Sequence, residues 1–301
     1  MEEVLGNGPG RARGAGTWLQ GARPRTLGAS VCPVLVGTAV AASQGRLVAW
    51  RVLASMVVSV AIQVGVNYAN DYSDGIRGSD SPARLGPVRL TASGLASPAQ
   101  VRRAAAIAFA TAALAGLAIA ATVDLWLLLV GVACILAAVL YTGGPRPYGY
   151  AGFGELAVLL FFGLVATTGT AYVQLERVSP VAVAASFPVG LAAVAILLAN
   201  NIRDLEGDRA AGKRTLVVQL GPARSRALYL ATVAGVFVSV GLIGLARPPA
   251  LLALLALPLA AGPVRLVRLR QDGPGLVAAL VATARLQLAV CALLAVGLWL
   301  S

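Results

Sequence analysis

Histidine is absent from this 301-residue sequence, lysine occurs once, and cysteine occurs three times. Without histidine the chain cannot use a Ser-His-Asp triad, a histidine general base, or a zinc or haem site built on imidazole. The cysteines, Cys32, Cys134 and Cys291, fall at wide separations inside apolar segments, so we interpret them as small apolar residues. A disulfide framework and a cysteine metal site are therefore not expected.

Charge is also scarce, because Asp, Glu, Lys and Arg make up 12% of the chain and hydrophobic residues 58%. A hydrocarbon core about 30 Å thick needs roughly 20 residues of helix, and seven of the eight charge-free runs are long enough. A ninth candidate contains one charge, Arg285, which can snorkel to the nearby interface. The runs are continuously apolar rather than alternating, which favours helices over a closed barrel. The sequence predicts an all-α integral membrane protein with nine transmembrane helices, at residues 26–45, 52–70, 104–123, 125–145, 156–175, 178–202, 227–246, 248–264 and 276–300.

The basic residues predict the orientation of the chain. With a cytoplasmic N-terminus, the cytoplasmic segments carry 19 Arg and Lys residues and the outer loops carry four, which is the positive-inside pattern. The C-terminus is then expected outside. We assign the net charge of +12 to the cytoplasmic membrane face and to an anionic substrate there, and we expect no nucleic-acid partner. Residues 1–22 are expected to form a mobile cytoplasmic tail, and residues 23–301 a single transmembrane domain.

Two polar stretches, "NYANDYSDGIRGSD" (67–80) and "NNIRDLEGDRAAGKRTL" (200–216), hold six of the twelve acidic residues. They end the second and sixth predicted helices, so both should emerge on the same side of the membrane. This spacing suggests two parallel pseudo-repeats of four helices plus one further helix, with a site shared between the halves. The matching residues are Asn67, Asp71 and Asp74 in the first stretch and Asn200, Asp204 and Asp208 in the second.

Residues three and four apart share one face of a helix, so each stretch presents a stripe of carboxylates and amides. Oxygen-only clusters of this kind suit Mg²⁺, and the surrounding Arg and Lys suit the oxygens of a diphosphate. The stripes are Asn67, Asn70, Asp71 and Asp74, and Asn200, Asn201, Asp204 and Asp208. The basic residues are Arg77, Arg84, Arg89, Arg203, Arg209, Lys213 and Arg214. Together they predict a diphosphate site at one membrane face.

Simpler interpretations exist for each residue type. Asp and Asn often cap helices or mark the water boundary, and Glu155 is a favourable first-turn acid for the helix that it opens. Tyrosines near the predicted interfaces can serve only as anchors; these are Tyr68, Tyr72, Tyr141, Tyr148 and Tyr150. A secondary transporter is an alternative of another class, although transporters place coupling residues near the midplane rather than at one face.

In these motifs the chain resembles the UbiA-type membrane prenyltransferases. Their Asn-Asp-x-x-Asp signature is matched by Asn70, Asp71 and Asp74, and their Asp-x-x-x-Asp signature by Asp204 and Asp208. The resemblance covers nearly the whole chain from about residue 20. It implies nine helices around a central cavity, in agreement with the helices predicted above.

Within that family the chain looks most like the menaquinone-pathway branch, the 1,4-dihydroxy-2-naphthoate polyprenyltransferases. One departure from the general family pattern is Gly78, which stands where a third Asp is common; Asp80 follows two residues later, as is usual in this branch. The segments that carry the likeness are "ARPRTLGASVCPVLVGTA" (22–39), "NDYSDGIRGSD" (70–80), "RLGPVRLTASG" (84–94), "YTGGPRPYGYAGFGE" (141–155) and "NNIRDLEGDRAAGKRTLVVQLG" (200–221).

The resemblance implies a mechanism in a bacterial cell membrane, with the active site at the cytoplasmic face. Two Mg²⁺ ions would hold a polyprenyl diphosphate whose tail lies in an apolar tunnel. A naphthoate carbon would attack the ionised allylic carbon, and loss of CO₂ would give demethylmenaquinone. The implied metal ligands and catalytic residues are Asp71, Asp74, Asp204 and Asp208, with Asn67, Asn70, Arg77, Asn200, Arg203 and Lys213 on the diphosphate.

The acceptor side is less defined by the sequence. Candidates for binding the acceptor or shielding the carbocation are Arg23, Arg25, Tyr68, Tyr72, Tyr141 and Arg146. The proton of the acceptor hydroxyl could pass to a carboxylate, to water or to the diphosphate. Another acceptor, such as 4-hydroxybenzoate or haem, is the alternative within prenyl transfer.

Overall fold

The computed structural model describes residues 14–78 and 88–301, and every element in these ranges is helical. The first half contains α1 (Gly14–Ala22), η1 (Pro24–Thr26), α2 (Gly28–Ser43), α3 (Ala49–Arg77), α4 (Pro98–Thr122) and α5 (Leu127–Leu140). After η2 (Tyr148–Ala151), the continuous segment α6 (Gly154–Val158), η3 (Leu159–Val165) and α7 (Ala166–Leu175) follows. The remainder contains α8 (Pro180–Ala210), α9 (Leu216–Ala246), η4 (Pro248–Ala256), α10 (Leu257–Leu269) and α11 (Gly273–Trp299).

Seven helical segments in the described ranges are long and apolar enough to cross a membrane. The all-helical membrane fold is therefore confirmed, whereas the count of nine spans is not. Two predicted spans form shorter helices, α2 with 16 residues and α5 with 14, or about 24 and 21 Å of helix. Their charge-free runs include residues that are not α-helical, Thr26 of the 3-10 helix η1 before α2 and the Gly-Gly-Pro turn after α5. Charge alone does not mark such breaks.

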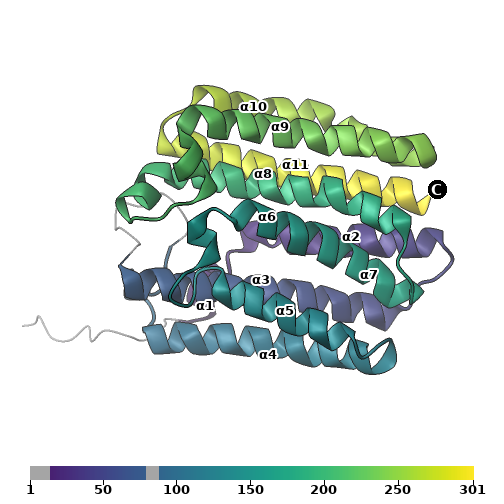
Figure 1. The fold of residues 1–301 in the computed structure, drawn as a ribbon, viewed down its shortest axis with the longest axis horizontal. Helices are drawn as coiled ribbons and strands as arrows, with labels where there is room; N and C mark the ends of the chain where they lie inside the picture. The colour runs from purple at the N-terminus through teal and green to yellow at the C-terminus, as the bar shows by residue number, and fades with distance from the viewer. Residues whose placement is uncertain (1–13, 79–87) are drawn as a thin grey trace, which may run out of the picture.

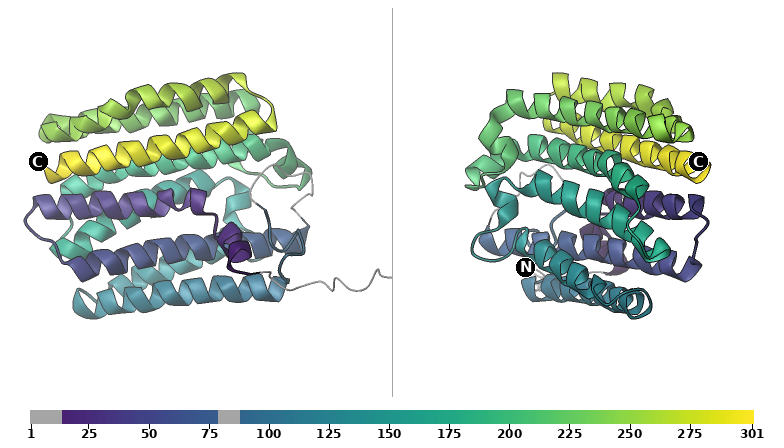
Figure 2. Two further views of the ribbon diagram at one scale, coloured as in Figure 1. Left: turned by 180° about the vertical axis from the view of Figure 1, so that it is seen from behind. Right: turned by 45° about the vertical axis from the view of Figure 1, so that its right-hand side comes forward.

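The helices lie side by side along the long axis of the molecule (Figure 1). In that view α9 and α10 form one edge and α4 the other, with α8 and α11 between them, and the reverse view agrees (Figure 2). The C-terminal ends of α3 and α8 lie at one end of the bundle, and the C-terminus of the chain lies at the other. The two acidic stretches thus emerge at the same end, as predicted.

The largest core cluster joins α2, α8, α9, η4 and α11 through small aliphatic residues. Lipid tails are as apolar as the helix surfaces, so the hydrophobic effect does not drive helices together within the bilayer. Small side chains allow the helix backbones to approach closely and pack instead. Gly163 of η3 and Gly190 of α8 show this, because a Cβ on either would lie 2.8 Å from the Cα of the other. This contact fixes η3 against α8, which carries the second acidic stretch.

Residues 14–22, placed in the tail by the sequence, form the short helix α1. Trp18 of α1 packs edge-on against Tyr68 of α3, with the ring centroids 5.9 Å apart. A nine-residue segment with few apolar side chains gives no periodic signal, so this tertiary contact was not visible in the sequence. Residues 1–13, the rest of the expected tail, lie outside the described residues.

Candidate active site

The acidic stretches are the last turns of α3 and α8, which continue beyond their apolar runs. Helix α3 ends at Arg77 and is capped by Gly78, whose φ of 66° places it in the left-handed region that favours glycine. This C-cap explains why glycine stands at a position where a third Asp was considered. Asp80 and Arg84 lie outside the described residues.

Lys213 joins the two stretches. Its Nζ lies 3.1 Å from Asp74 Oδ1, at the end of α3, and 3.5 Å from Asp208 Oδ1, at the end of α8. Arg89 adds a second cation, with Nη2 3.0 Å from the other carboxylate oxygen of Asp74. Asp74 is only 3% exposed, and a buried carboxylate needs such compensation. The two predicted acidic stretches therefore meet around Lys213.

Tyr150, which the sequence left as a possible interfacial anchor, belongs to this cluster. Its hydroxyl donates to Asp74, and the ammonium of Lys213 lies 4.6 Å from the centre of its ring. Burial and the nearby Asp74 charge raise the pKa of the Tyr150 hydroxyl. The hydroxyl therefore remains a hydrogen-bond donor at neutral pH. The sequence signal that could have found it is the quoted 141–155 segment itself.

That segment folds over the end of α3. Arg77 donates from its guanidinium to the backbone carbonyls of Thr142 and Gly144, and the hydroxyl of Thr142 donates to Asn70 Oδ1 over 2.7 Å. Arg77 and Asn70 were both expected to bind diphosphate. Arg77 instead holds the segment in place, while Asn70 also lines the cavity described below.

Asp71 has a different environment from Asp74, although both were predicted to bind metal. Its two carboxylate oxygens accept hydrogen bonds from the backbone N–H groups of Leu90 and Thr91, over 2.8 and 2.9 Å. It is fully buried and is not among the described residues that line the cavity. In this structure Asp71 anchors the segment that carries Arg89.

Arg203, which was expected to bind the diphosphate, instead forms an ion pair with the adjacent residue, Asp204. Its guanidinium forms a two-pronged ion pair with Asp204, with N–O distances of 2.7 Å, and donates to Asn200 Oδ1 over 2.9 Å. The Arg203 side chain is 1% exposed. It compensates the charge of Asp204, which does line the cavity.

Asn67 lines the cavity, but both polar atoms of its side chain form hydrogen bonds within the protein. Its amide nitrogen donates to the carbonyl of Ala22 over 2.8 Å, and its oxygen accepts from Gln63. This contact joins the end of α1 to α3.

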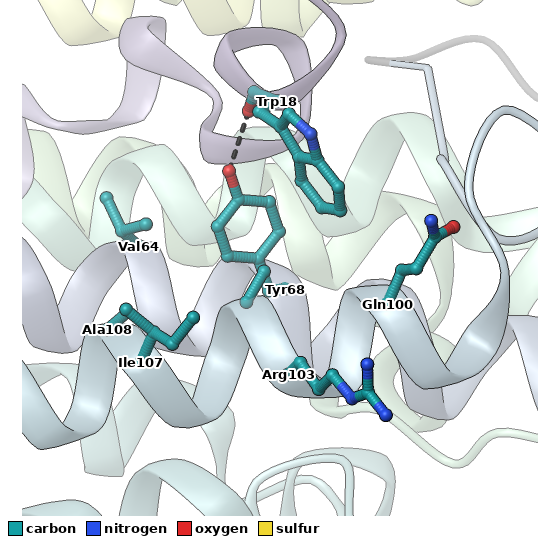
Figure 3. A pocket seen from close by; sticks show the side chains of 8 residues that line it. Trp18, Val64, Tyr68, Gln100, Arg103, Ile107 and Ala108 are labelled. Carbon is teal, nitrogen blue, oxygen red and sulfur yellow. Dashed lines mark hydrogen bonds between the residues drawn. The ribbon is translucent and has the colours of Figure 1, made fainter. Parts of the chain in front are cut away.

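Tyr68 and Tyr72 lie on the side of α3 that faces away from the cavity, so the structure does not support cation shielding by either. Tyr68 donates to the carbonyl of Trp18 over 2.7 Å and borders a separate groove against α4 (Figure 3). Tyr72 packs into the small cluster around Leu90 and Val101. The sequence shows which residues share a face of α3, but it does not show which neighbouring helix that face contacts. The direction of Tyr68 and Tyr72 was therefore not predictable.

The remaining acceptor candidates are divided. Tyr141 and Arg23 line the cavity, and Tyr141 packs edge-on against Tyr148 with centroids 5.4 Å apart. Arg146 is exposed and is not among the described lining residues. The side chain of Arg25 lies outside what the structure describes.

Glu155 and Asn201 form a buried pair that the sequence did not reveal. Asn201 donates from its amide to Glu155 Oε1 over 3.0 Å, and Glu155 is 7% exposed. Glu155 is thus more than a first-turn acid, because it joins the 141–155 segment to the second acidic stretch.

All these elements surround one cavity of about 420 Å³. Its polar end carries Asn67, Asn70, Asp74, Arg89, Asn200, Asn201, Asp204, Asp208 and Lys213. Its remaining wall is mostly apolar, with Phe161, Phe162 and Leu197 among the residues that line it. The cavity suits an amphipathic molecule with an anionic head and a long apolar tail.

A family model described as the UbiA prenyltransferase family matches residues 30–286. The chain belongs to this family. The match includes both acidic stretches and every helix from α2 to the first half of α11.

Two relatives with curated names extend the comparison. The chain is 52% identical to 1,4-dihydroxy-2-naphthoate octaprenyltransferase of Mycobacterium tuberculosis over 253 residues, 82% of this chain and 86% of the relative. It is 36% identical to the protein of the same name from Escherichia coli over 293 residues, 94% of this chain and 95% of the relative.

Solved structures of other UbiA homologues share the fold. The apo structure of a homologue from Aeropyrum pernix K1 has a TM-score of 0.63 at 18% identity, covering 89% of this chain and 96% of that one. A homologue from Archaeoglobus fulgidus bound to GPP and Mg²⁺ has a TM-score of 0.60 at 15% identity, covering 92% and 99%. At such identities the likeness establishes the fold alone.

Proposed function

We propose that this UbiA-family protein transfers a polyprenyl group from a polyprenyl diphosphate to 1,4-dihydroxy-2-naphthoate, releasing diphosphate and CO₂ and giving demethylmenaquinol, the hydroquinone form of demethylmenaquinone. The main structural support is a cavity with Lys213 bridging two acidic stretches at one end and apolar walls beyond. The names of relatives at 52% and 36% identity support the naphthoate as acceptor.

Asp74, Asp204 and Asp208 are the acids of the predicted metal set that line the cavity. No three acidic, histidine or cysteine side chains of the described ranges converge as a ready metal-binding cluster. Mg²⁺ fits this arrangement, because it takes one or two carboxylates and fills its other positions with water and phosphate oxygens. We propose two such ions; when bound, Mg²⁺ would supply charge that stabilises the departing diphosphate.

Lys213 and Arg89 are the cations best placed for the diphosphate, since both already contact Asp74 at the polar end. As negative charge grows on the leaving group, these preorganised cations stabilise it without having to move far. Tyr141 and Tyr150 also line this end of the cavity. Their rings can face the allylic cation, with about 1–2 kcal/mol of cation–π stabilisation each.

The placement of the acids argues for an enzyme rather than a transporter. The acids lie in the last turns of α3 and α8, at one end of the bundle, rather than at mid-height. We propose that this end faces the cytoplasm of a bacterial cell, on the basis of the distribution of basic residues.

The decisive experiment is an assay of product formation by the purified protein in lipid. A polyprenyl diphosphate is supplied with either 1,4-dihydroxy-2-naphthoate or 4-hydroxybenzoate, in Mg²⁺ or in excess chelator. We expect a prenylated naphthoquinol and CO₂ in Mg²⁺ only. Product from 4-hydroxybenzoate alone would overturn the choice of acceptor, and no product from either acceptor would favour the transporter alternative.

A further inference from the structure

Three glycines line the apolar part of the cavity, and each comes from a different helix. They are Gly116 of α4, Gly131 of α5 and Gly169 of α7. A glycine inside a helix costs about 1 kcal/mol relative to alanine. Glycine at three helical positions around one cavity therefore needs a physical explanation.

Neither packing nor backbone conformation supplies that reason. A Cβ built on Gly131 or Gly169 would have no described neighbouring atom within 4 Å, and one on Gly116 would meet only Val58, at 4.0 Å. None of the three has a positive φ. Gly163 and Gly190, by contrast, are in close contact with each other. All three residues line the cavity, so side chains added at these positions would occupy open space that borders it rather than contact another helix.

The three glycines lie at a similar height, toward the end of the bundle remote from the acids. Gly116 is six residues from the end of α4 and Gly169 six from the end of α7, while Gly131 is four from the start of α5. These distances correspond to about 6–9 Å of helix.

Printed contacts place these three helix ends beside one another. Arg51, at the start of α3, donates to the carbonyl of Thr122 at the end of α4 and to that of Val173 in α7, over 3.2 and 2.9 Å. Trp126, just before α5, donates to the hydroxyl of Tyr172 in α7 over 3.1 Å. The glycines therefore border the same far region of the cavity.

We infer that Gly116, Gly131 and Gly169 set the length of the polyprenyl tail that the enzyme accepts, by keeping the far end of the cavity open. The inference rests on the proposed function, which places the diphosphate at the acids and the tail along the apolar wall. A short tail ends before it reaches the glycines. A long tail must pass them, and any side chain added there occupies its path.

The test is donor competition in Gly131→Leu and Gly169→Leu. Each variant receives 1,4-dihydroxy-2-naphthoate with geranyl diphosphate and with a polyprenyl diphosphate of eight isoprene units, and kcat/KM is measured for each donor. We expect the value for the long donor to fall about tenfold or more, the scale of forcing extra methylenes into a filled site. The value for geranyl diphosphate should stay close to that of the wild type.

Gly241→Leu in α9 is the matched control. A Cβ there also has no described neighbour within 4 Å, but Gly241 is not among the described residues that line the cavity. Its donor ratio should be unchanged. If a leucine variant fails to fold, as judged by its melting temperature, Gly131→Ala and Gly169→Ala should shift the ratio the same way by a smaller factor.

The outcomes separate this inference from the function on which it rests. Equal ratios in the wild type, the cavity variants and the control would overturn the role of the glycines and leave prenyl transfer intact. An equal loss with both donors in a folded variant would overturn it too. A wild-type protein that prenylates the naphthoate with neither donor would refute the proposed function itself.

Discussion

Lys213 contacts one acid from each stretch, so its ammonium compensates two carboxylates at once. It is also the only lysine in the sequence. Under the proposed function this charge lies where negative charge develops on the leaving diphosphate. We expect Lys213→Met to lower kcat/KM by about 10²–10³, the range for removing a preorganised electrostatic contact.

The neighbouring arginine provides a control for that prediction. Arg214 is exposed, and its backbone N–H rather than its side chain bonds to Tyr150. The kcat/KM of Arg214→Ala should therefore stay within a few-fold of the wild-type value. Steady-state kinetics of both variants, with the donor varied, would contradict the bridging role if Lys213→Met and Arg214→Ala behaved alike.

Asp71 and Asp74 are three residues apart, but we expect their substitution to have different effects, mainly on stability for Asp71 and mainly on activity for Asp74. Asp71 accepts two backbone hydrogen bonds in a fully buried position. Asp71→Ala leaves both N–H groups unsatisfied, which costs about 1–3 kcal/mol of stability for each group. We expect a lower melting temperature together with lower activity.

Asp74→Asn should instead reduce activity more than stability. The amide keeps one acceptor oxygen for Lys213 and Tyr150, and Arg89, which loses its acceptor, is a side chain that can move rather than a fixed backbone N–H group. Thermal melts beside turnover rates separate the two cases. Unchanged stability in Asp71→Ala would show that the segment around Leu90 does not depend on this carboxylate.

Tyr150 gives a prediction in pH. Burial and the Asp74 charge raise the pKa of its hydroxyl, so the proton is retained to higher pH than in free tyrosine. The hydrogen bond to Asp74 should therefore contribute equally throughout the neutral range. The ratio of wild-type to Tyr150→Phe turnover should be constant from about pH 6 to pH 9. A ratio that falls toward one within that range would mean that the hydroxyl loses its proton there.

At the scale of elements, the end of the bundle remote from the acids is joined by an ion pair between helices. Glu176 follows α7, and its Oε1 lies 2.8 Å from Arg51 of α3 and 2.9 Å from Arg46 in the α2–α3 connection. The hydrogen bond from Arg51 is the main reason that the pKa of Glu176 is lowered. A carboxyl whose pKa is lower in the folded than in the unfolded state stabilises the fold when the pH is above the unfolded-state pKa. This stabilisation is lost as the pH falls through the folded-state pKa.

The difference in melting temperature between the wild type and Glu176→Gln should accordingly be positive at pH 7 and shrink in acid. Glu206→Gln is the control, since Glu206 is exposed and pairs with Arg209 on its own helix. Such a pair contributes little. A Glu176 difference that persists below about pH 3 would contradict the ion-pair explanation.

Helix positions were predictable because the cost of charge in hydrocarbon leaves long uncharged runs. The shortening of α2 and α5 was not, since a turn in an apolar run carries no charge signal. For the site, the matched spacing predicted that α3 and α8 would meet. It did not reveal that Arg203 pairs with its own neighbour or that Tyr68 faces α4, because spacing within one helix does not locate the surrounding helices.

At the scale of the whole molecule, the cavity joins a charged end to an apolar far end. Helices from both halves of the chain line it, so neither half encloses the site alone. The α6–α7 segment and α8 meet at the Gly163–Gly190 contact. This contact and the Glu155–Asn201 hydrogen bond hold the 141–155 segment relative to the second acidic stretch.

The final prediction concerns which way this cavity faces. The distribution of basic residues predicts that the acidic end faces the cytoplasm. Val178 lies between α7 and α8 and Ala211 between α8 and α9, so the two exposed residues are at opposite ends of α8. In intact cells a membrane-impermeant maleimide should label Val178→Cys. It should label Ala211→Cys only after the membrane is opened.

The wild-type protein is the control, because Cys32 and Cys291 are buried and Cys134 is half-buried within α5. The reverse labelling pattern would place Asp74, Asp208 and Lys213 on the outer face. A polyprenyl diphosphate would then have to reach the acids from outside the cell, and the positive-inside assignment would be wrong for this chain.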